Sequence, residues 1–189
     1  MTEPVIFREV GQFQGFPKIA RYSRLCTITE KIDGTNASIW IDDLGVEFRT
    51  ASRTKWITTG DDNAGFAKWA NEHREELMQL GPGHHFGEWW GLGIQRKYGQ
   101  DRKRFSLFNT FLYSEKRPAC CDVVPVIYEG MFDQVAVEHS INVLRTQGSM
   151  AAPGFMNPEG IVIYHQAAKQ YFKKTLVGDE KPKGSTEAA

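Results

Sequence analysis

The sequence predicts an α+β fold in which antiparallel sheets are flanked by helices. Strand-like runs rich in β-branched and aromatic residues are mixed with only two isolated helical segments. Strands and helices do not alternate, which argues against a parallel βαβ arrangement. The chain of 189 residues is long enough to bury a substantial core. We predict one domain over residues 1–177.

The first strands are expected over residues 26–32 and 35–41, which are rich in β-branched and apolar residues. They flank Asp33-Gly34, a dipeptide typical of tight turns. Residues 45–50 could add a third strand. This part of the chain is therefore expected to form antiparallel sheet.

A first helix is predicted over residues 61–80, where apolar side chains recur at three- and four-residue spacing. Either Asp61 or Asp62 is expected to cap its start, because both have short acceptor side chains. Gly81-Pro82-Gly83 follows the last apolar position and should end the helix.

A second helix is predicted over residues 134–146, with Asp133 as its cap and Gly148 as its stop. The remaining strand candidates are residues 84–91, 105–112, 122–130, 159–165 and 171–177. Residues 178–189 have almost nothing to bury, so we expect a disordered tail there.

Composition excludes several classes of protein. The 23 basic and 23 acidic residues balance, so the whole molecule lacks the positive charge of many nucleic-acid binders. The sequence has three cysteines, Cys26, Cys120 and Cys121. Their odd number argues against a disulfide framework, and their spacing is not that of zinc ligands. With no signal peptide and no apolar run long enough for a bilayer, we expect a cytoplasmic protein without a membrane partner.

One local basic segment, residues 95–104, carries five cations around Tyr98. Such a segment suits a phosphate backbone, and the aromatic ring could stack on a base. A solvated loop is an equally good interpretation of the same residues. The candidates for nucleic-acid contact are Arg96, Lys97 and Arg102.

Lys31 is the main candidate for chemistry, because it lies at the end of an apolar predicted strand just before Asp33-Gly34. A lysine amine is normally protonated at pH 7, but partial burial and nearby cations favour the neutral, nucleophilic form. The familiar phosphate-binding patterns GxxxxGK[ST] and GxGxxG are absent from the sequence. On its own, the tetrapeptide from Lys31 to Gly34 is more typical of a surface lysine before a turn.

The wider sequence changes this interpretation. Glu30-Lys31-Ile32-Asp33-Gly34-Thr35-Asn36 resembles the signature of the covalent nucleotidyltransferases, which include ATP-dependent DNA ligases, RNA ligases and capping guanylyltransferases. Further motifs of that group have candidates in the same order along the chain. They are Thr50-Ala51-Ser52-Arg53, Phe86-Gly87-Glu88, Phe105-Ser106-Leu107-Phe108-Asn109, Glu159-Gly160-Ile161-Val162 and Phe172-Lys173-Lys174. The resemblance implies a nucleotidyltransferase fold, an ATP-grasp-like adenylation domain.

The resemblance also implies roles for individual residues. Lys31 would form a covalent bond to AMP, and Glu159 would help to bind Mg²⁺ or Mn²⁺. The nucleotide-binding residues implied are Glu30, Asp33, Asn36, Arg53, Glu88, Phe108, Lys173 and Lys174. Glu88 would hold the ribose hydroxyls and Phe108 would stack on the purine. Because alternate residues of a strand face opposite sides, only one lysine of the last pair can easily face the nucleotide, and we favour Lys173.

Thr35-Asn36 and Gly87-Glu88-Trp89-Trp90-Gly91 are similar to motifs of the RNA ligase 2 family, in particular its small bacterial and phage members. This resemblance implies an ATP-dependent RNA ligase that joins 5′-phosphate and 3′-hydroxyl ends in a bacterial or phage-infected cell. RNA ends or a nicked duplex would be the nucleic-acid partner. Larger members carry a C-terminal domain for which this sequence has no counterpart, which leaves open an accessory protein in that role.

Three alternatives remain at this point. A minimal DNA ligase and a capping-type guanylyltransferase use the same chemistry, although Thr35-Asn36 fits both less well. A non-catalytic nucleotide- or RNA-binding relative is the third. It fits less well because Lys31, Glu88, Glu159 and Lys173 are all present, and a binding protein has no use for a nucleophile.

Overall fold

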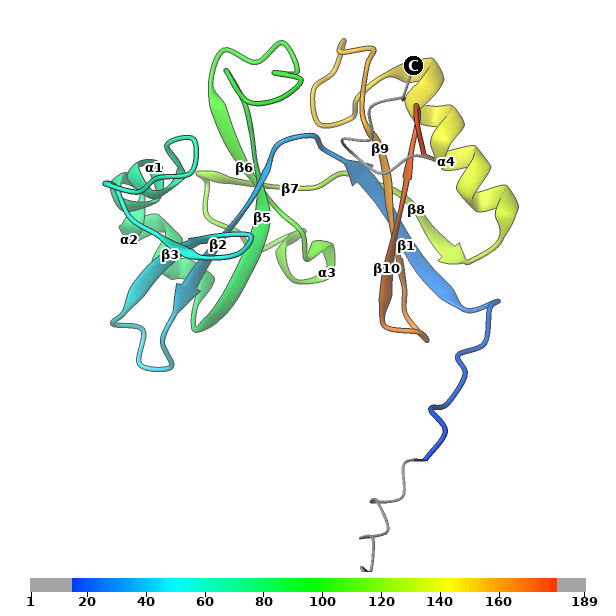
Figure 1. Cartoon of the computed structure of the whole chain (residues 1–189), viewed down its shortest axis with the longest axis horizontal. Coiled ribbons are helices and arrows are strands. Elements are labelled where there is room, and N and C mark those ends of the chain that lie inside the picture. The colour runs from blue at the N-terminus through cyan, green and yellow to red at the C-terminus, as the bar shows by residue number, and fades with distance from the viewer. Residues whose placement is uncertain (1–14, 180–189) are drawn as a thin grey trace, which may run out of the picture.

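The computed structural model describes residues 15–179, which form two β-sheets lying side by side (Figure 1). The smaller sheet has the order β10-β9-β1-β8 and the larger sheet the order β4-β3-β2-β5-β6-β7. Every strand pair is antiparallel except β6 with β7, which is parallel. The α+β prediction is therefore confirmed, and the expectation of antiparallel sheets holds for all but one pair.

Each sheet combines strands from separate parts of the chain. The smaller sheet consists of β1 (Leu25–Lys31), β8 (Val126–Met131), β9 (Gly160–His165) and β10 (Gln170–Thr175). The larger sheet consists of β2 (Thr35–Ile41), β3 (Phe48–Ser52), β4 (Trp56–Ile57), β5 (Gly83–Gly91), β6 (Lys103–Leu107) and β7 (Cys121–Val123).

Each sheet has its own apolar core under its own helices. Cys26 and Ile28 of β1 pack with Ile141 and Leu144 of α4 (Gln134–Gln147) under the smaller sheet. Under the larger sheet, alternate residues of β2 pack against α1 (Phe66–Glu72) and α2 (Arg74–Leu77). A third, smaller cluster joins the sheets where β1 leads into β2, and its buried members are Ile32, Trp90, Tyr98, Val124 and Ala152.

The first two strands do not pair with each other, so the antiparallel arrangement suggested by Asp33-Gly34 is wrong for this pair. β1 pairs with β8 and β9, whereas β2 pairs with β3 and β5. The two strands contribute to different cores, and burying both apolar faces outweighs the local preference for a tight hairpin. Asp33-Gly34 is therefore the crossing between the two sheets.

The first predicted helix is interrupted. Residues 61–80 contain α1, α2 and the short 3₁₀ helix η1 (Met78–Leu80), with His73 between α1 and α2 at φ −106° and ψ 19°. The carboxylate of Asp62 accepts hydrogen bonds from the amides of Ala67 and Lys68, so Asp62 rather than Asp61 satisfies the helix start. Gly81 follows η1, as predicted.

Two strand predictions fail in part. The run 105–112 is a strand only to Leu107, because the Asn109 side chain accepts the Leu112 amide and begins α3 (Thr110–Tyr113). The run 122–130 is divided between β7 and β8, which belong to different sheets. Pro125 lies at this division and cannot donate a backbone hydrogen bond to a sheet.

The other elements agree with the sequence within a few residues. Asp133 accepts the Ala136 amide at 2.7 Å at the start of α4, and Gly148 ends that helix. β3, β5, β9 and β10 lie where strands were expected. Most of the predicted tail, residues 180–189, lies outside the described residues. Among residues 15–179, no helix has the length and apolar character that crossing a bilayer requires.

Candidate functional site

Lys31 lies at the end of β1 and forms an ion pair with a buried carboxylate. Lys31 is opposite Gly160 in the β1–β9 register, and Glu159 directly precedes Gly160. The pairing of β1 with β9 therefore brings Lys31 and Glu159 together. Lys31 Nζ is 2.7 Å from Glu159 Oε2. The Lys31 side chain is 21% exposed and that of Glu159 only 2%. The amine is thus held by a fixed charge and is still accessible from outside.

The turn after Lys31 is fixed by three hydrogen bonds from distant segments. The Asp33 amide donates to the Tyr98 hydroxyl at 2.8 Å, and the Gly34 amide donates to Glu88 Oε1 at 3.0 Å. Arg96 Nε donates to Asp33 Oδ2 at 3.0 Å. Gly34 itself packs against the backbone of β5, where an added Cβ would meet the Trp89 carbonyl oxygen. Segments around residues 31–36, 88, 96–98 and 159 therefore converge.

Glu88 projects from β5 on the same face of the larger sheet as Asn36, its direct cross-strand neighbour. Burial is the main reason why the pKa of the Glu88 carboxyl rises to about 7. Nearby Lys31 and the Gly34 amide favour the charged form, whereas Glu159 and Asp33 disfavour it. Glu88 is thus a carboxyl group close to half protonation at neutral pH.

This raised pKa predicts a pH-dependent stability. The unfolded carboxyl ionises near pH 4.5 and the folded one near 7, so stability is lost as the pH rises through that window. Replacing Glu88 with Gln keeps the oxygen that accepts the Gly34 amide and removes the charge. We expect Glu88→Gln to be more stable than the wild type at pH 8, by at most about 3 kcal/mol, with little gain at pH 4. Thermal unfolding at both pH values measures this, and an equal Tm difference at both would contradict it.

Lys173 and Lys174 face opposite sides of the smaller sheet. Lys173 is opposite Val162, which is opposite Thr29, so Lys173 shares a face with Thr29 and Lys31. Lys174 Nζ lies 3.5 Å from Glu138 Oε1 of α4, on the other face. The structure therefore places Lys173 on the Lys31 face and directs Lys174 away from it, so the nucleotide contact expected of Lys174 is not supported.

Glu30 also lies on the far side of the sheet from Lys31. Glu30 is 1% exposed, and its carboxylate accepts hydrogen bonds from the Ser149 hydroxyl and the amides of Met150 and Ala151. Burial raises the pKa of Glu30, while these three donors lower it. Glu30 thus anchors the segment after α4, and its predicted contact with a nucleotide is not supported by this position.

Two other predicted residues lie on the surface near the converging segments. Arg53 is exposed in the turn between β3 and β4. Phe108 is 36% exposed just after β6, and its amide donates to the carbonyl of Phe86 in β5. Since Phe86 and Glu88 are alternate residues of one strand, Phe108 lies beside the face that carries Glu88.

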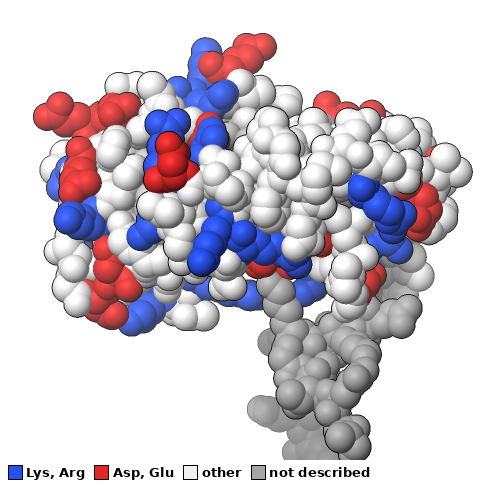
Figure 2. Space-filling view, turned by 90° about the horizontal axis from the view of Figure 1, so that it is seen from above, with Lys and Arg blue, Asp and Glu red and all other residues white. Residues whose placement is uncertain are grey.

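Two arginines of the basic segment, residues 95–104, form contacts within the protein, whereas the composition of the segment suggested contact with a nucleic acid. Arg96 is engaged with Asp33 and also donates to Asn157, and Arg104 forms two 2.8 Å hydrogen bonds with Asp122. Tyr98 is buried, so the idea that its ring stacks on a base is wrong. Lys97 and Arg102 are exposed. Figure 2 shows basic and acidic side chains mixed on the face in view rather than one continuous basic surface.

The sequence did not reveal the contacts that hold the site in place. Tyr98 and Arg96 orient Asp33, and Asn63 donates to the Asn36 carbonyl at 3.2 Å. Asn157 receives two hydrogen bonds from Arg96 through its carbonyl and side-chain oxygens. No periodicity or spacing marks these contacts, because each joins segments that are distant along the chain.

A divalent metal fits this site only with help from a substrate. Within residues 15–179, no three His, Cys, Asp or Glu side chains are grouped so that they could hold a metal ion by themselves. Glu159 and Asp33 are nevertheless close enough to Glu88 to act on its carboxyl group electrostatically. Mg²⁺ commonly uses one or two carboxylates together with substrate phosphates, which suits such a set.

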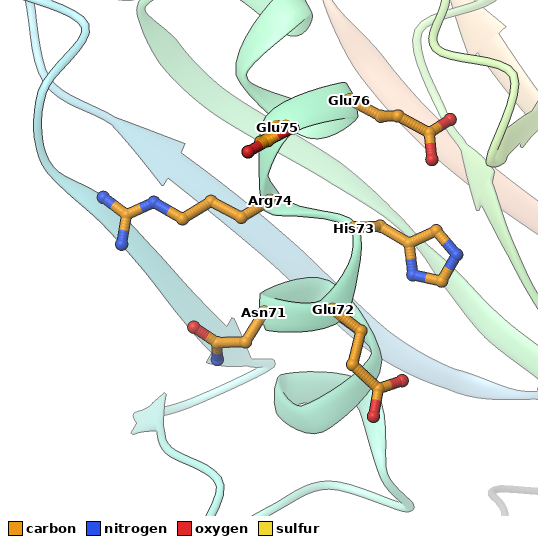
Figure 3. Close-up of a pocket in the computed structure, with 6 residues that line it drawn as sticks. All are labelled: Asn71, Glu72, His73, Arg74, Glu75 and Glu76. Atoms are coloured by element: carbon orange, nitrogen blue, oxygen red, sulfur yellow. The ribbon is translucent and has the colours of Figure 1, made fainter.

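A separate surface hollow of about 360 Å³ lies along α1 and α2 (Figure 3). Its lining residues are Asn71, Glu72, His73, Arg74, Glu75 and Glu76. Their side chains fan out around the helices rather than converging on one point. None of them belongs to the segments around Lys31, so this hollow is not the candidate site.

Comparisons with known proteins gave one family match and several solved structures with a similar fold. Residues 24–175 match the family described as RNA ligase. An apo mutant of a Naegleria gruberi RNA ligase superposes with a TM-score of 0.60 at 19% identity, covering 80% of this chain and 49% of that one. A mutant with AMP and Mn gives 0.60 at 18% identity, with 82% and 50% covered. A mutant with ATP and Mn gives 0.59 at 18% identity, with 80% and 49% covered.

These structural matches concern the fold, and this chain spans about half the length of each solved chain. No curated protein matches significantly. The family match covers most of the chain, including Lys31, Glu88 and Glu159. The chain therefore belongs to the RNA ligase family.

Proposed function

We propose that this chain is the nucleotidyl-transfer domain of an ATP-dependent RNA ligase and that Lys31 carries AMP as a covalent intermediate. The observation that carries this proposal is the partly exposed Lys31 amine, held 2.7 Å from the buried Glu159 carboxylate beside the Asp33-Gly34 turn. An ordinary surface lysine before a turn would not require this partner, nor the hydrogen bonds that join the turn to Tyr98, Arg96 and Glu88.

In the first step, the lone pair of neutral Lys31 Nζ attacks the α-phosphorus of ATP. A phosphorus–nitrogen bond forms, the bond from that phosphorus to the bridging oxygen breaks, and pyrophosphate leaves with the electron pair. The amine must first lose a proton, and Glu159 Oε2 at 2.7 Å is in position to accept it or to pass it to solvent. Such a reaction depends mainly on alignment and on neutralising phosphate charge.

Other residues, which come from both sheets, would hold the nucleotide. Lys173 and Arg53 would supply positive charge to the phosphates, and Glu88 would accept hydrogen bonds from the ribose hydroxyls. Phe108, partly exposed beside β5, would stack on adenine. Asn36 lies directly opposite Glu88 and would complete the polar lining.

Mg²⁺ or Mn²⁺ would be held by Glu159 and the ATP phosphates, and it would neutralise charge on those phosphates. The solved ligases with ATP or AMP and Mn support this expectation by their shared fold.

The next two steps join the RNA. A 5′-phosphate oxygen attacks the lysyl-AMP phosphorus, which breaks the phosphorus–nitrogen bond and returns the electron pair to Lys31. A 3′-hydroxyl oxygen then attacks the phosphorus of the 5′-phosphate and forms the new phosphodiester bond. The bond from that phosphorus to the bridging oxygen of AMP breaks, AMP leaves with the electron pair, and the hydroxyl proton passes to solvent. The proposed substrates are RNA ends, either as free single strands or meeting at a nick.

Incubation with ATP, Mg²⁺ or Mn²⁺ and 5′-phosphorylated RNA tests the function. We expect joined RNA from the wild type and none from Lys31→Ala. A DNA substrate of the same sequence tests the minimal DNA ligase, and covalent labelling by GTP in place of ATP tests the capping enzyme. Nucleotide binding without any covalent transfer would favour the non-catalytic relative and would contradict the proposal.

A further inference from the structure

The larger sheet carries a row of exposed and half-buried rings on the face that also carries Glu88. The aromatic row consists of Trp40 in β2, Trp56 in β4, and His84 and Phe86 in β5. Trp56 is 51% exposed and Phe86 is 48% exposed. The other face of the same strands buries Ala37, Ile39 and Ile41 in the core, so the row is not needed to complete that core.

The rings contact one another in sequence. His84 stacks on Phe86 with centroids 4.1 Å apart, and Trp56 stacks on His84 at 6.0 Å. Trp40 meets the edge of Trp56 at 6.4 Å. Arg49 covers this end of the row, with its guanidinium carbon 5.7 Å from the Trp40 ring centre and 6.0 Å from that of Trp56. Large exposed apolar patches of this kind usually mark binding surfaces.

The aromatic row leads directly to the candidate site. In the β2–β5 register, Trp40 pairs with His84, Ser38 with Phe86 and Asn36 with Glu88. Successive positions on one face are about 6.6–6.8 Å apart, so the rings and the site form one track along the sheet. Phe108 lies next to Phe86 through their backbone hydrogen bond and extends the aromatic surface toward the adenine position.

We propose that the aromatic row binds the unpaired nucleotides of an RNA strand whose end is being joined. Exposed rings offer stacking faces to bases, and a guanidinium beside them adds a cation for phosphate or ring contact. Bases inside a duplex are already stacked on each other, so the row favours single-stranded ends over a nicked duplex. This role depends on the proposed ligase function, because it concerns how RNA reaches Lys31.

Fluorescence anisotropy with a labelled single-stranded oligoribonucleotide tests this role. Trp56→Ala should weaken binding roughly tenfold or more, because stacking on one ring is worth that much for one base. Trp56→Phe should restore most of the affinity. Phe111→Ala is the matched control, since Phe111 is 95% exposed on α3 outside the row, and should leave the affinity unchanged. Binding of the same sequence as a duplex should depend much less on Trp56.

Equal affinities for the wild type and Trp56→Ala, with matching Tm values, would overturn the proposal. A Trp56-dependent dimer in size-exclusion chromatography, with RNA affinity unchanged, would overturn it in favour of a protein interface. Labelling of the wild type by ATP separates the two proposals. If ATP labels the protein but its RNA affinity does not depend on Trp56, the ligase proposal stands and the proposal for the aromatic row is wrong. If ATP does not label the protein but its RNA affinity depends on Trp56, the proposal for RNA binding stands and the ligase proposal is wrong.

Discussion

Replacing Glu159 with Gln is expected to slow AMP transfer to Lys31 about 100- to 1,000-fold. Glu159 places a fixed negative charge 2.7 Å from the Lys31 amine, and it would also hold the metal that neutralises the ATP phosphates. Glutamine keeps the size and one oxygen but removes the charge, so both roles are lost. Single-turnover labelling with ATP at saturating Mn²⁺ measures the rate.

The exposed ion pair between Lys55 and Asp61 provides the control for Glu159→Gln. Both of its side chains are more than half exposed, and such pairs contribute little. Asp61→Asn should therefore label at the wild-type rate. A Glu159→Gln protein that is folded by its Tm and labels within threefold of the wild type would remove Glu159 from the proposed mechanism.

Replacing Gly34 with Ala is expected to lower both stability and labelling. An added Cβ would meet the Trp89 carbonyl oxygen, which belongs to β5, and lie 2.8 Å from Trp90 Cβ. The turn must then move away from Glu88 and carry Lys31 with it. Overpacking of this kind costs about 1–3 kcal/mol, and a displacement of about 1 Å can reduce a rate 100-fold. Urea unfolding and the labelling rate measure the two effects.

Gly60→Ala is the matched control for this change. A Cβ at Gly60 would have Thr58 Oγ1 as its nearest neighbour, at an ordinary contact distance of 3.9 Å. Neither the unfolding free energy nor labelling should change noticeably in that variant. A Gly34→Ala protein that keeps the wild-type labelling rate would show that the close contact between the turn and β5 does not position Lys31.

Local signals predicted the elements whose partners are close along the chain. The periodicity over residues 134–146, the Asp133 cap and the Gly148 stop identify α4 because a helix depends on neighbouring residues. The break at His73 was not visible in the same way, since apolar spacing continues across it. Asp33-Gly34 was misleading, because a local turn preference cannot tell a hairpin from a crossing between sheets.

The candidate site could be predicted only as a set of motifs. Their order along the chain singled out Lys31, Glu88 and Glu159, and the structure brings these three together. Strand alternation correctly separated Lys173 from Lys174, which face opposite sides. Composition could not show that Arg96 holds Asp33 or that Tyr98 is buried, because both depend on contacts across more than 60 residues.

The aromatic row could not be predicted from the sequence either. Trp40, Trp56, His84 and Phe86 come from three strands, and each could equally have been a core residue. Only the register between β2 and β5 places His84 opposite Trp40 and shows which face they share.

Incubation with α-labelled ATP and Mg²⁺ or Mn²⁺, followed by denaturation, tests the central claim most directly. We expect label to remain on the denatured wild-type protein and to be absent from Lys31→Ala. Folded wild-type protein, free of bound AMP, that takes up no label with either metal would contradict the account. Label of equal amount on Lys31→Ala would contradict the assignment of Lys31 as the nucleophile.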